Sequence, residues 1–438
     1  DEMGIAVGRE QLQTLFVAVF FVMLAAVPIY GWVSSHFPKR LIVPVVYGFF
    51  ILNLIAFWIL LSGDGRTKTV ASVFFIWASV FNLFVVSLFW SVMSDLYASQ
   101  QAKRLYGFIA AGGSAGAFAG PIITQSFVRI IGPDDLLLVS ALLLSLALAA
   151  AILLRRTMPG EANAENTKRS IGKSILAGAV RVWQSPYLFR IALWILLGNL
   201  VSTYFYLEQS RIVGEALADR TARVQLLARI DLAVSILTIL LQVSATGRLI
   251  ERFGVGFAAA MLPTWCAVGL IGLAISPTLA VIVTIMAVER AIAFAFATPA
   301  IKVLYTVVDE DEKYKAQNFI DTVVFRGGDA ASGWLFNTLG KTLGMAGGAV
   351  ALLALPMALA WLWLSFALGR QLAGDLGGRE AAFGGLTAGH GDGVVEQQLV
   401  GDVHLRRDGG ADAEAGRVII RAVADVLEQM RRIGERRD

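Results

Sequence analysis

Stretches of about 20 apolar residues recur along the chain and are separated by shorter polar segments. A stretch of this length and composition can cross a bilayer as one α-helix. We predict eleven such helices, at Leu12–Val33, Leu41–Ser62, Thr69–Asp95, Leu105–Ile131, Leu136–Leu154, Tyr187–Val213, Val224–Ile250, Val255–Ser276, Leu279–Tyr305, Gln317–Leu343 and Met345–Leu368. The pattern therefore predicts an all-α membrane protein.

Two polar regions divide the chain. The segment 155–185 is mostly polar and contains Pro159 and Gly160, which is typical of a linker between two helical bundles. Beyond Arg370 the apolar pattern stops and Gly, Asp and Arg become frequent. We predict an N-terminal bundle of five spans at 1–154, a cytoplasmic linker at 155–185, a six-helix bundle at 186–370 and a flexible soluble tail at 371–438.

Composition supports this class and excludes others. The 438 residues are 57% hydrophobic and 16% charged, which is unlike a soluble domain of that length. The basic residues are scattered at predicted helix ends, so the net charge of +4 does not indicate nucleic-acid binding. Cys266 is the only cysteine and the three histidines lack ligand spacing, so we predict no metal and no cofactor. Nucleotide-binding glycine loops and catalytic triads are absent from the sequence, so we predict no enzymatic activity.

Basic loops predict the orientation in the membrane. Positive charge gathers in 34–40, 100–104 and 155–173 and at Arg370, whereas the alternate loops are acidic or mixed. Loops rich in Lys and Arg usually stay in the cytoplasm. We therefore expect these loops and the C-terminus on the cytoplasmic side of the cell inner membrane.

A short motif occurs at the same place in both halves. Gly31 is followed by Lys39 and Arg40 after the first predicted helix, and Gly247-Arg-Leu-Ile-Glu251-Arg252-Phe-Gly254 follows the seventh. The second copy resembles the G-x-L-x-D/E-R-x-G signature of the major facilitator superfamily, in which glycine lets two helices approach. The resemblance implies two pseudo-symmetric bundles, with the first of twelve spans missing here. The alternative is that a glycine and a basic turn recur by chance in cytoplasmic loops.

Two further stretches carry recognisable motifs. One is Leu88-Phe-Trp90 with Gln101-Ala-Lys103-Arg104-Leu-Tyr106-Gly107, and the other runs from Pro299 through Tyr305 to Asp321. Both are similar to stretches of the non-mitochondrial ATP/ADP translocases of plastids and intracellular bacteria, which implies exchange of ATP and ADP. The sequence departs from that family at Gln101 and Gln317, which replace an acid and a lysine, and at Lys302, which replaces an acid.

We expect these two stretches to shape and gate the cytoplasmic entrance, with ordinary solvated loops as the alternative. The residues concerned are Lys103, Arg104, Tyr106, Asp309, Lys313, Lys315 and Asp321. The glycine-rich run 112–121 resembles the glycine–proline motif of antiporters. Glycines at intervals of four allow close helix contact, and Pro121 can bend a helix. Tight packing without a mechanistic role is equally compatible with this run.

Glu289 and Arg290 are adjacent charges in the middle of the apolar stretch Leu279–Tyr305. A charge at that depth costs about 2.5 kcal/mol or more, so it usually faces a partner or a water-filled path. Neighbouring residues point about 100° apart on a helix, so the two charges cannot simply neutralise each other. They predict either a transport cavity or a buried brace between helices.

Other charged and aromatic residues at membrane depth complete the predicted site. An anionic nucleotide needs cations for its phosphates and an aromatic or apolar surface for its base. Arg326 and Asp329 could instead form a structural ion pair, and Arg190 could extend to the membrane surface. The predicted substrate-binding residues are Glu289, Arg290, Lys302, Arg326, Asp329, Trp90, Arg190 and Asp231, with Trp194, Tyr204 and Phe294 as further stacking candidates.

We therefore expect a secondary-active transporter that exchanges ATP and ADP, or related anionic metabolites, by rocking its halves about a midplane site. One alternative is a proton-coupled carrier of another solute, with Glu289 as proton acceptor. Another is a non-transporting membrane scaffold that binds partners through the amphipathic stretch Arg417–Ile433. The expected partners are the lipid bilayer and a small anionic substrate, and the expected state is a monomer.

Overall fold

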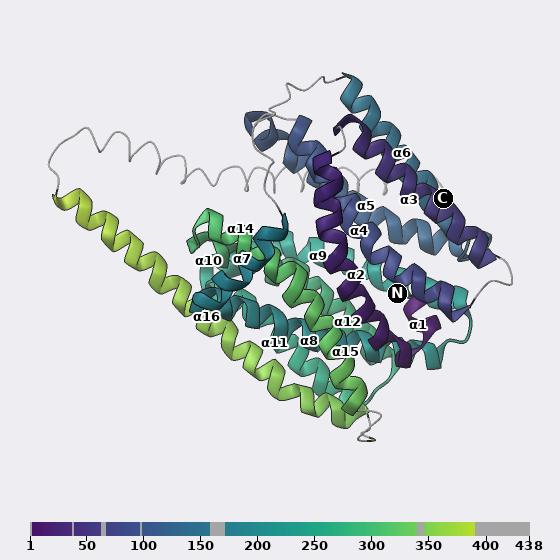
Figure 1. Ribbon diagram of the computed structural model, residues 1–438. Coiled ribbons are helices and arrows are strands. Elements are labelled where there is room, and N and C mark those ends of the chain that lie inside the picture. Colours follow the sequence, from purple (N-terminus) through teal and green to yellow (C-terminus); the bar gives the residue numbers. More distant parts are fainter. Residues whose placement is uncertain are drawn as a thin grey trace, which may run out of the picture.

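The computed structural model describes residues 2–36, 39–62, 67–96, 99–157, 171–339, 344 and 347–389, which are almost all helical (Figure 1). The first half contains α1 (Glu2–Val7), α2 (Arg9–His36), α3 (Lys39–Ser62), α4 (Lys68–Leu96), α5 (Ser99–Ile131) and α6 (Leu136–Thr157). The linker helix is α7 (Ile171–Gln184). The second half contains α8 (Pro186–Ala216), α9 (Arg220–Leu241), η1 (Gln242–Thr246), α10 (Gly247–Phe253), α11 (Val255–Ile275), α12 (Leu279–Ile292), η2 (Ala293–Ala297), α13 (Thr298–Leu304), η3 (Tyr305–Val307), α14 (Glu310–Phe319), η4 (Ile320–Val324), α15 (Phe325–Asn337) and α16 (Gly347–Gly389).

Nine helical segments of the described chain are long and apolar enough to cross a membrane, and each matches a predicted span. The other two predicted spans, Leu105–Ile131 and Gln317–Leu343, are also helical wherever the structure describes them. The first lies in α5, and the second begins in α14 and continues through η4 and α15. Both contain many glycine and polar residues, which is typical of helices that border water or another helix.

Two hydrophobic cores organise the helices. The smaller core joins α2, α3, α4 and α6 through residues such as Phe50 and Leu88. The larger core joins mainly α8, α11, α12 and α16, around Phe205 and Trp361. The closest pairs within the halves are α3 with α6 and α11 with α16, and Figure 1 shows these pairs on opposite outer sides of the molecule.

The two halves meet along two helix pairs, α2 with α15 and α5 with α9. The short motif follows α2 in the first half and α9 in the second, so these two helices correspond. Helices α5 and α15 come three spans later in each half and correspond in the same way. The contact of α2 with α15 is therefore equivalent to that of α9 with α5. The rings of Phe16 (α2) and Phe75 (α4) have centroids 6.2 Å apart, and those of Phe16 and Tyr206 (α8) are 5.9 Å apart. We call the helix ends near α7 the linker end and the opposite ends, where these rings lie, the far end.

The linker and the start of the tail contain helix that the sequence pattern did not predict. Helix α7 lies within the linker, and α16 continues to Gly389, past the predicted boundary at 370. Gly178 of α7 lies so close to α14 that an added Cβ would be 2.9 Å from the carbonyl carbon of Lys315. This backbone contact and the burial of Val182 hold α7 against the second half. The predicted tail helix Arg417–Ile433 lies outside the described residues.

The structure corrects two expectations about glycine. Within the described part of the chain, Gly247, Gly112, Gly116 and Gly120 have no atom within 4 Å of an added Cβ, so these positions show no close contact with a neighbouring helix. Gly254 is the motif glycine that the backbone requires, because its φ of 82° between α10 and α11 is favourable only for glycine. Gly31 and Arg40 lie in α2 and α3, and their side-chain surroundings are outside the described part of the chain.

Candidate substrate site

Helix α8 connects two carboxylates at the middle of the second half. Ser202 Oγ donates to Glu289 Oε1 of α12 over 2.6 Å, and Thr203 Oγ1 donates to Asp329 Oδ1 of α15 over 3.1 Å. Glu289 is only 5% exposed, so its carboxylate lies in the packing between α8 and α12. This position agrees with the predicted brace between helices and not with the predicted open cavity.

Arg290 points to a different helix from its neighbour Glu289. Its Nη1 lies 2.5 Å from Asp231 Oδ1 of α9, and the two side chains are 34% and 38% exposed. Asp231 and Arg290 are each eleven residues from the far-end start of their helices, a distance of about 16 Å. That distance is half of a typical hydrocarbon core. The pair therefore lies near the bilayer midplane and is partly accessible.

One partly exposed residue and three exposed residues at intervals of four form a stripe, which we call the α12–α13 stripe. They are Arg290, Phe294, Thr298 and Lys302; Phe294 is 51% exposed, whereas Ala291, Ala295 and Ala300 are fully buried. In a regular α-helix, twelve residues would turn Lys302 about 120° away from Arg290. The π-turn η2 adds one residue to a turn and removes most of that rotation. Because a polar stripe facing lipid would be costly, it indicates a water-filled path.

The π-turn is held by hydrogen bonds from polar side chains. Thr246 of η1 donates to the carbonyl of Ala295 over 3.0 Å, and Gln242 donates to the carbonyl of Phe294 over 3.3 Å. Thr298 donates to the carbonyl of Ala293 over 3.0 Å. A π-turn leaves backbone carbonyls without their usual partners, so these donors stabilise it within an apolar environment.

Arg326 and Asp329 form the ion pair that their spacing allows, with Arg326 Nη1 3.4 Å from Asp329 Oδ2. The pair belongs to α15, and its carboxylate is also bonded by Thr203. Asp321 of η4 is exposed. The positive charge of Arg326 is therefore already balanced by a neighbour on its own helix.

The remaining predicted binding residues lie elsewhere. Arg190 donates to Gln371 of α16 at the linker end, so it is not brought to Arg290. Trp90 of α4 is 41% exposed, and its ring packs edge-on against Phe89. The expectation that Trp194 and Tyr204 stack on a substrate is wrong. Both are buried; the Trp194 indole donates to Ser365 Oγ and the Tyr204 hydroxyl to the Gly347 carbonyl.

The predicted gating residues of the second stretch belong to a helix start. Asp309 precedes α14, and its carbonyl accepts from the Lys313 amide over 2.8 Å. Helix α14 also carries Lys315 and packs against α7, where Arg181 forms a 2.9 Å ion pair with Glu312. Lys103, Arg104 and Tyr106 lie in α5, with side chains outside the described part. The gating role stays a prediction.

A cavity of about 340 Å³ lies between α5 and α9. It is lined by Glu2, Gly120, Pro121, Thr124, Val224, Leu227, Ala228 and Asp231. Asp231 thus connects the midplane ion pair to this cavity. The glycine-rich run of α5 contributes Gly120 and Pro121 to the cavity wall, and the carbonyl of Ala117 in the same run accepts from Ser235 of α9 over 3.1 Å.

A cluster of charges lies at the far-end mouth of this cavity, and we call it the far-end cluster. Arg220 of α9 bonds Glu2 of α1 over 3.0 Å and also bonds Asp134, which precedes α6. Arg223 lies 3.3 Å from Glu2. The cluster joins residues of the first half to α9 in the second half. Sequence reasoning missed it because its members come from three separate loops and helix ends.

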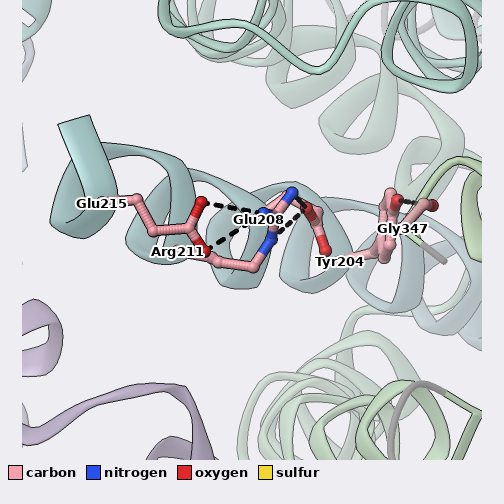
Figure 2. Close-up of polar contacts among 5 residues, drawn as sticks. All are labelled: Tyr204, Glu208, Arg211, Glu215 and Gly347. Carbon is pink, nitrogen blue, oxygen red and sulfur yellow. Dashed lines mark hydrogen bonds and ion pairs between the residues drawn. The ribbon is translucent and has the colours of Figure 1, made fainter. Parts of the chain in front are cut away.

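A second group missed from the sequence lies at the far end of α8. Figure 2 shows Glu208, Arg211 and Glu215 in succession along the helix, with Tyr204 reaching Gly347 at the start of α16. Arg211 Nη2 lies 2.7 Å from Glu208, and its Nη1 lies 3.1 Å from Glu215. The i, i+3 and i, i+4 spacing of these charges was the available signal.

Comparison with known proteins identifies the fold. Residues 3–328 match the profile of the Major Facilitator Superfamily. The structure is similar to the crystal structure of a mutant of the nucleoside transporter NupG, with a TM-score of 0.55 and 13% sequence identity over 84% of this chain and 91% of that one. No curated protein sequence matches the chain. Because the profile covers most of the apolar region, the chain belongs to the major facilitator superfamily and is a multi-pass membrane transporter.

Proposed function

We propose that the protein is a secondary-active carrier that exchanges an anionic, nucleotide-like metabolite by alternating access. The observation that carries this proposal is the α12–α13 stripe, in which Arg290 and Lys302 flank the exposed ring of Phe294. A cation can bind a phosphate and an aromatic face can receive a base. The fold similarity to a nucleoside transporter is compatible with a substrate that contains a base.

The charges at membrane depth limit how many phosphates the stripe can hold. Arg290 is paired with Asp231, and Arg326 with Asp329. Lys302 is exposed and, among the described residues, has no carboxylate within 4.0 Å. A nucleotide would therefore find two cations in the stripe. Lys302 has no carboxylate partner among the described residues, whereas Arg290 must first separate from Asp231. ADP and AMP fit this balance more readily than ATP does.

Uptake into proteoliposomes tests the proposal. Labelled ATP, ADP, AMP and adenosine are supplied outside, with or without the same compound inside. We expect exchange of at least one phosphorylated compound and a fall of about 10- to 100-fold in its kcat/KM in Arg290→Gln, since one charge-assisted contact is lost. Arg248→Gln removes an exposed arginine from α10 and serves as the matched control. Unchanged anion transport in both Arg290→Gln and Lys302→Gln would contradict the proposal.

A proton-coupled carrier is the second candidate, and Glu289 is the observation that favours it. Its carboxylate is buried, accepts one hydrogen bond from Ser202, and forms no ion pair among the described residues. A buried charge without a paired charge is unfavourable, so a proton on this carboxyl would fit its surroundings. Protonation and release during the transport cycle could then couple the solute to a proton gradient.

Imposed pH gradients distinguish the two candidates. In a proton-coupled carrier, an acidic exterior drives uptake into the vesicles, and Glu289→Gln abolishes that drive while keeping the shape of the side chain. In an exchanger, counter-substrate drives uptake and the response to Glu289→Gln is small. Ser202→Ala is the companion variant, because it removes the hydrogen bond but leaves the carboxyl group in place.

A further inference from the structure

The ion pair between Asp231 and Arg290 differs from the other pairs at membrane depth. It joins two helices, α9 and α12, whereas Arg326 and Asp329 lie on the same helix. Both side chains are about one third exposed, and Asp231 lines the cavity between α5 and α9. A solute in that cavity can therefore reach the pair without the helices first separating.

Asp231 and an anionic substrate would compete for the same guanidinium group. An unpaired arginine near the midplane is costly, and the carboxylate 2.5 Å away reduces that cost. Among the described residues, Glu289 forms no ion pair with Arg290, and its carboxylate accepts from Ser202 of α8 instead. An incoming phosphate must therefore replace Asp231 as the partner of Arg290.

We propose that Asp231 is the resident counter-ion of Arg290 and that the substrate displaces it in each transport cycle. This inference rests on the proposed function, because it requires an anion that binds Arg290. Asp231 then determines two properties of the carrier. It lowers apparent affinity for anions, and it neutralises the empty site so that the empty carrier can change conformation.

The second property determines the balance between exchange and net transport. A carrier can catalyse net uptake only if its empty form returns across the membrane. With Asp231 in place, the returning site holds a neutral pair. Without the carboxylate, the empty site would carry an uncompensated Arg290, and its return would be slow. A bound anion would remove that obstacle, so exchange would continue.

Asp231→Asn, reconstituted as the full chain in proteoliposomes, tests the proposal with ADP and AMP as probes. We expect the apparent affinity for ADP and AMP to rise about tenfold, because no carboxylate then competes with the substrate for Arg290. We also expect the ratio of exchange to net uptake to rise about tenfold as the unloaded return slows. A purely structural role for Asp231 would lower both rates together and leave their ratio unchanged.

Two control variants isolate the role of the carboxylate. Asp231→Glu retains the charge and should keep the wild-type ratio. Asp219→Asn removes an exposed carboxylate from the N-cap of the same helix, where asparagine can still accept from the Ala222 amide, and should change neither quantity. Equal affinity and an equal exchange ratio in Asp231→Asn and wild type would overturn the inference. Failure of both proteins to bind either probe would overturn the proposed function and the inference with it.

Discussion

Arg211 bonds two carboxylates on α8 that differ greatly in burial. The Glu208 side chain is 2% exposed, whereas that of Glu215 is 65% exposed. Glu208 makes buried charge-assisted hydrogen bonds to Arg211, whereas an exposed pair such as that with Glu215 contributes little. The two glutamates should therefore differ in their contribution to stability although they bond the same arginine.

We expect Glu208→Gln to lower the free energy of unfolding by about 1.5–3 kcal/mol, because the buried charge-assisted hydrogen bonds to Arg211 are lost while Glu215 still balances the arginine. Glu215→Gln should change it by less than about 0.5 kcal/mol, because water already screens that pair. Thermal unfolding of the two variants in the same detergent, followed by near-UV circular dichroism, compares them directly. Equal losses in both variants would show that burial does not control the strength of these contacts.

At the residue scale, the sequence could predict which charges lie in the membrane but not which groups face them. The 100° offset between Glu289 and Arg290 required different surroundings, and the structure shows one facing α8 and the other α9. Helical spacing also allowed the pair between Arg326 and Asp329. The partnership of Asp231 with Arg290 depends on how two helices pack, which no local pattern contains.

At the element scale, a close contact between two helix backbones predicts a large effect of one added methyl group. Gly369 of α16 faces Gly256 of α11, and an added Cβ on Gly369 would lie 2.7 Å from the Gly256 amide nitrogen. Both groups are backbone, so no side chain can move away. We expect Gly369→Ala to cost about 1–3 kcal/mol of stability, as other overpacking substitutions do.

Gly374→Ala is the matched control, because it lies on the same helix with no atom within 4 Å of an added Cβ. There the substitution should be neutral or stabilising by about 1 kcal/mol, since alanine favours a helix more than glycine does. Fluorescence-detected chromatography after heating gives the unfolding temperature of each variant. Similar values for the two would contradict the close contact between α11 and α16.

The elements themselves were largely predictable, because length and apolarity specify a spanning helix. The nine segments that meet these criteria in the described chain all coincide with predicted spans. Patterning did not reveal the π-turns, which arise where side chains such as Thr246 bond carbonyls of another helix. Nor did it reveal α7, whose position depends on backbone contact with α14.

At the scale of the whole molecule, the described residues include several contacts between the halves at the far end. The rings of Phe16, Phe75 and Tyr206 meet there, and the far-end cluster links Glu2 to Arg220. Toward the linker end, Trp90, Phe294 and Phe325 are each at least 40% exposed. Under the proposed alternating-access function, we predict that the far end is closed in this conformation. Opening that end requires the far-end cluster to separate.

Arg220→Gln should therefore shift the carrier toward a conformation that is open at the far end. The substitution removes both ion pairs that Arg220 makes, with Glu2 and with Asp134, whose side chains are each 9% exposed. The readout is the labelling rate of Thr124→Cys, a residue of the cavity wall, in a Cys266→Ala background. A membrane-impermeant thiol reagent is added outside intact cells, where the basic loops predict the far end to lie.

We expect labelling in Arg220→Gln to be about tenfold faster than in the parent, since the ion pairs no longer favour the closed state. Arg211→Gln is the matched control, because it removes an arginine at the same end whose ion pairs lie within α8 alone. That variant should label at the parent rate even if it is less stable. A rate increase shared by both variants would indicate general loosening of the fold. No increase in Arg220→Gln would show that the ion pairs of Arg220 do not hold the far end closed.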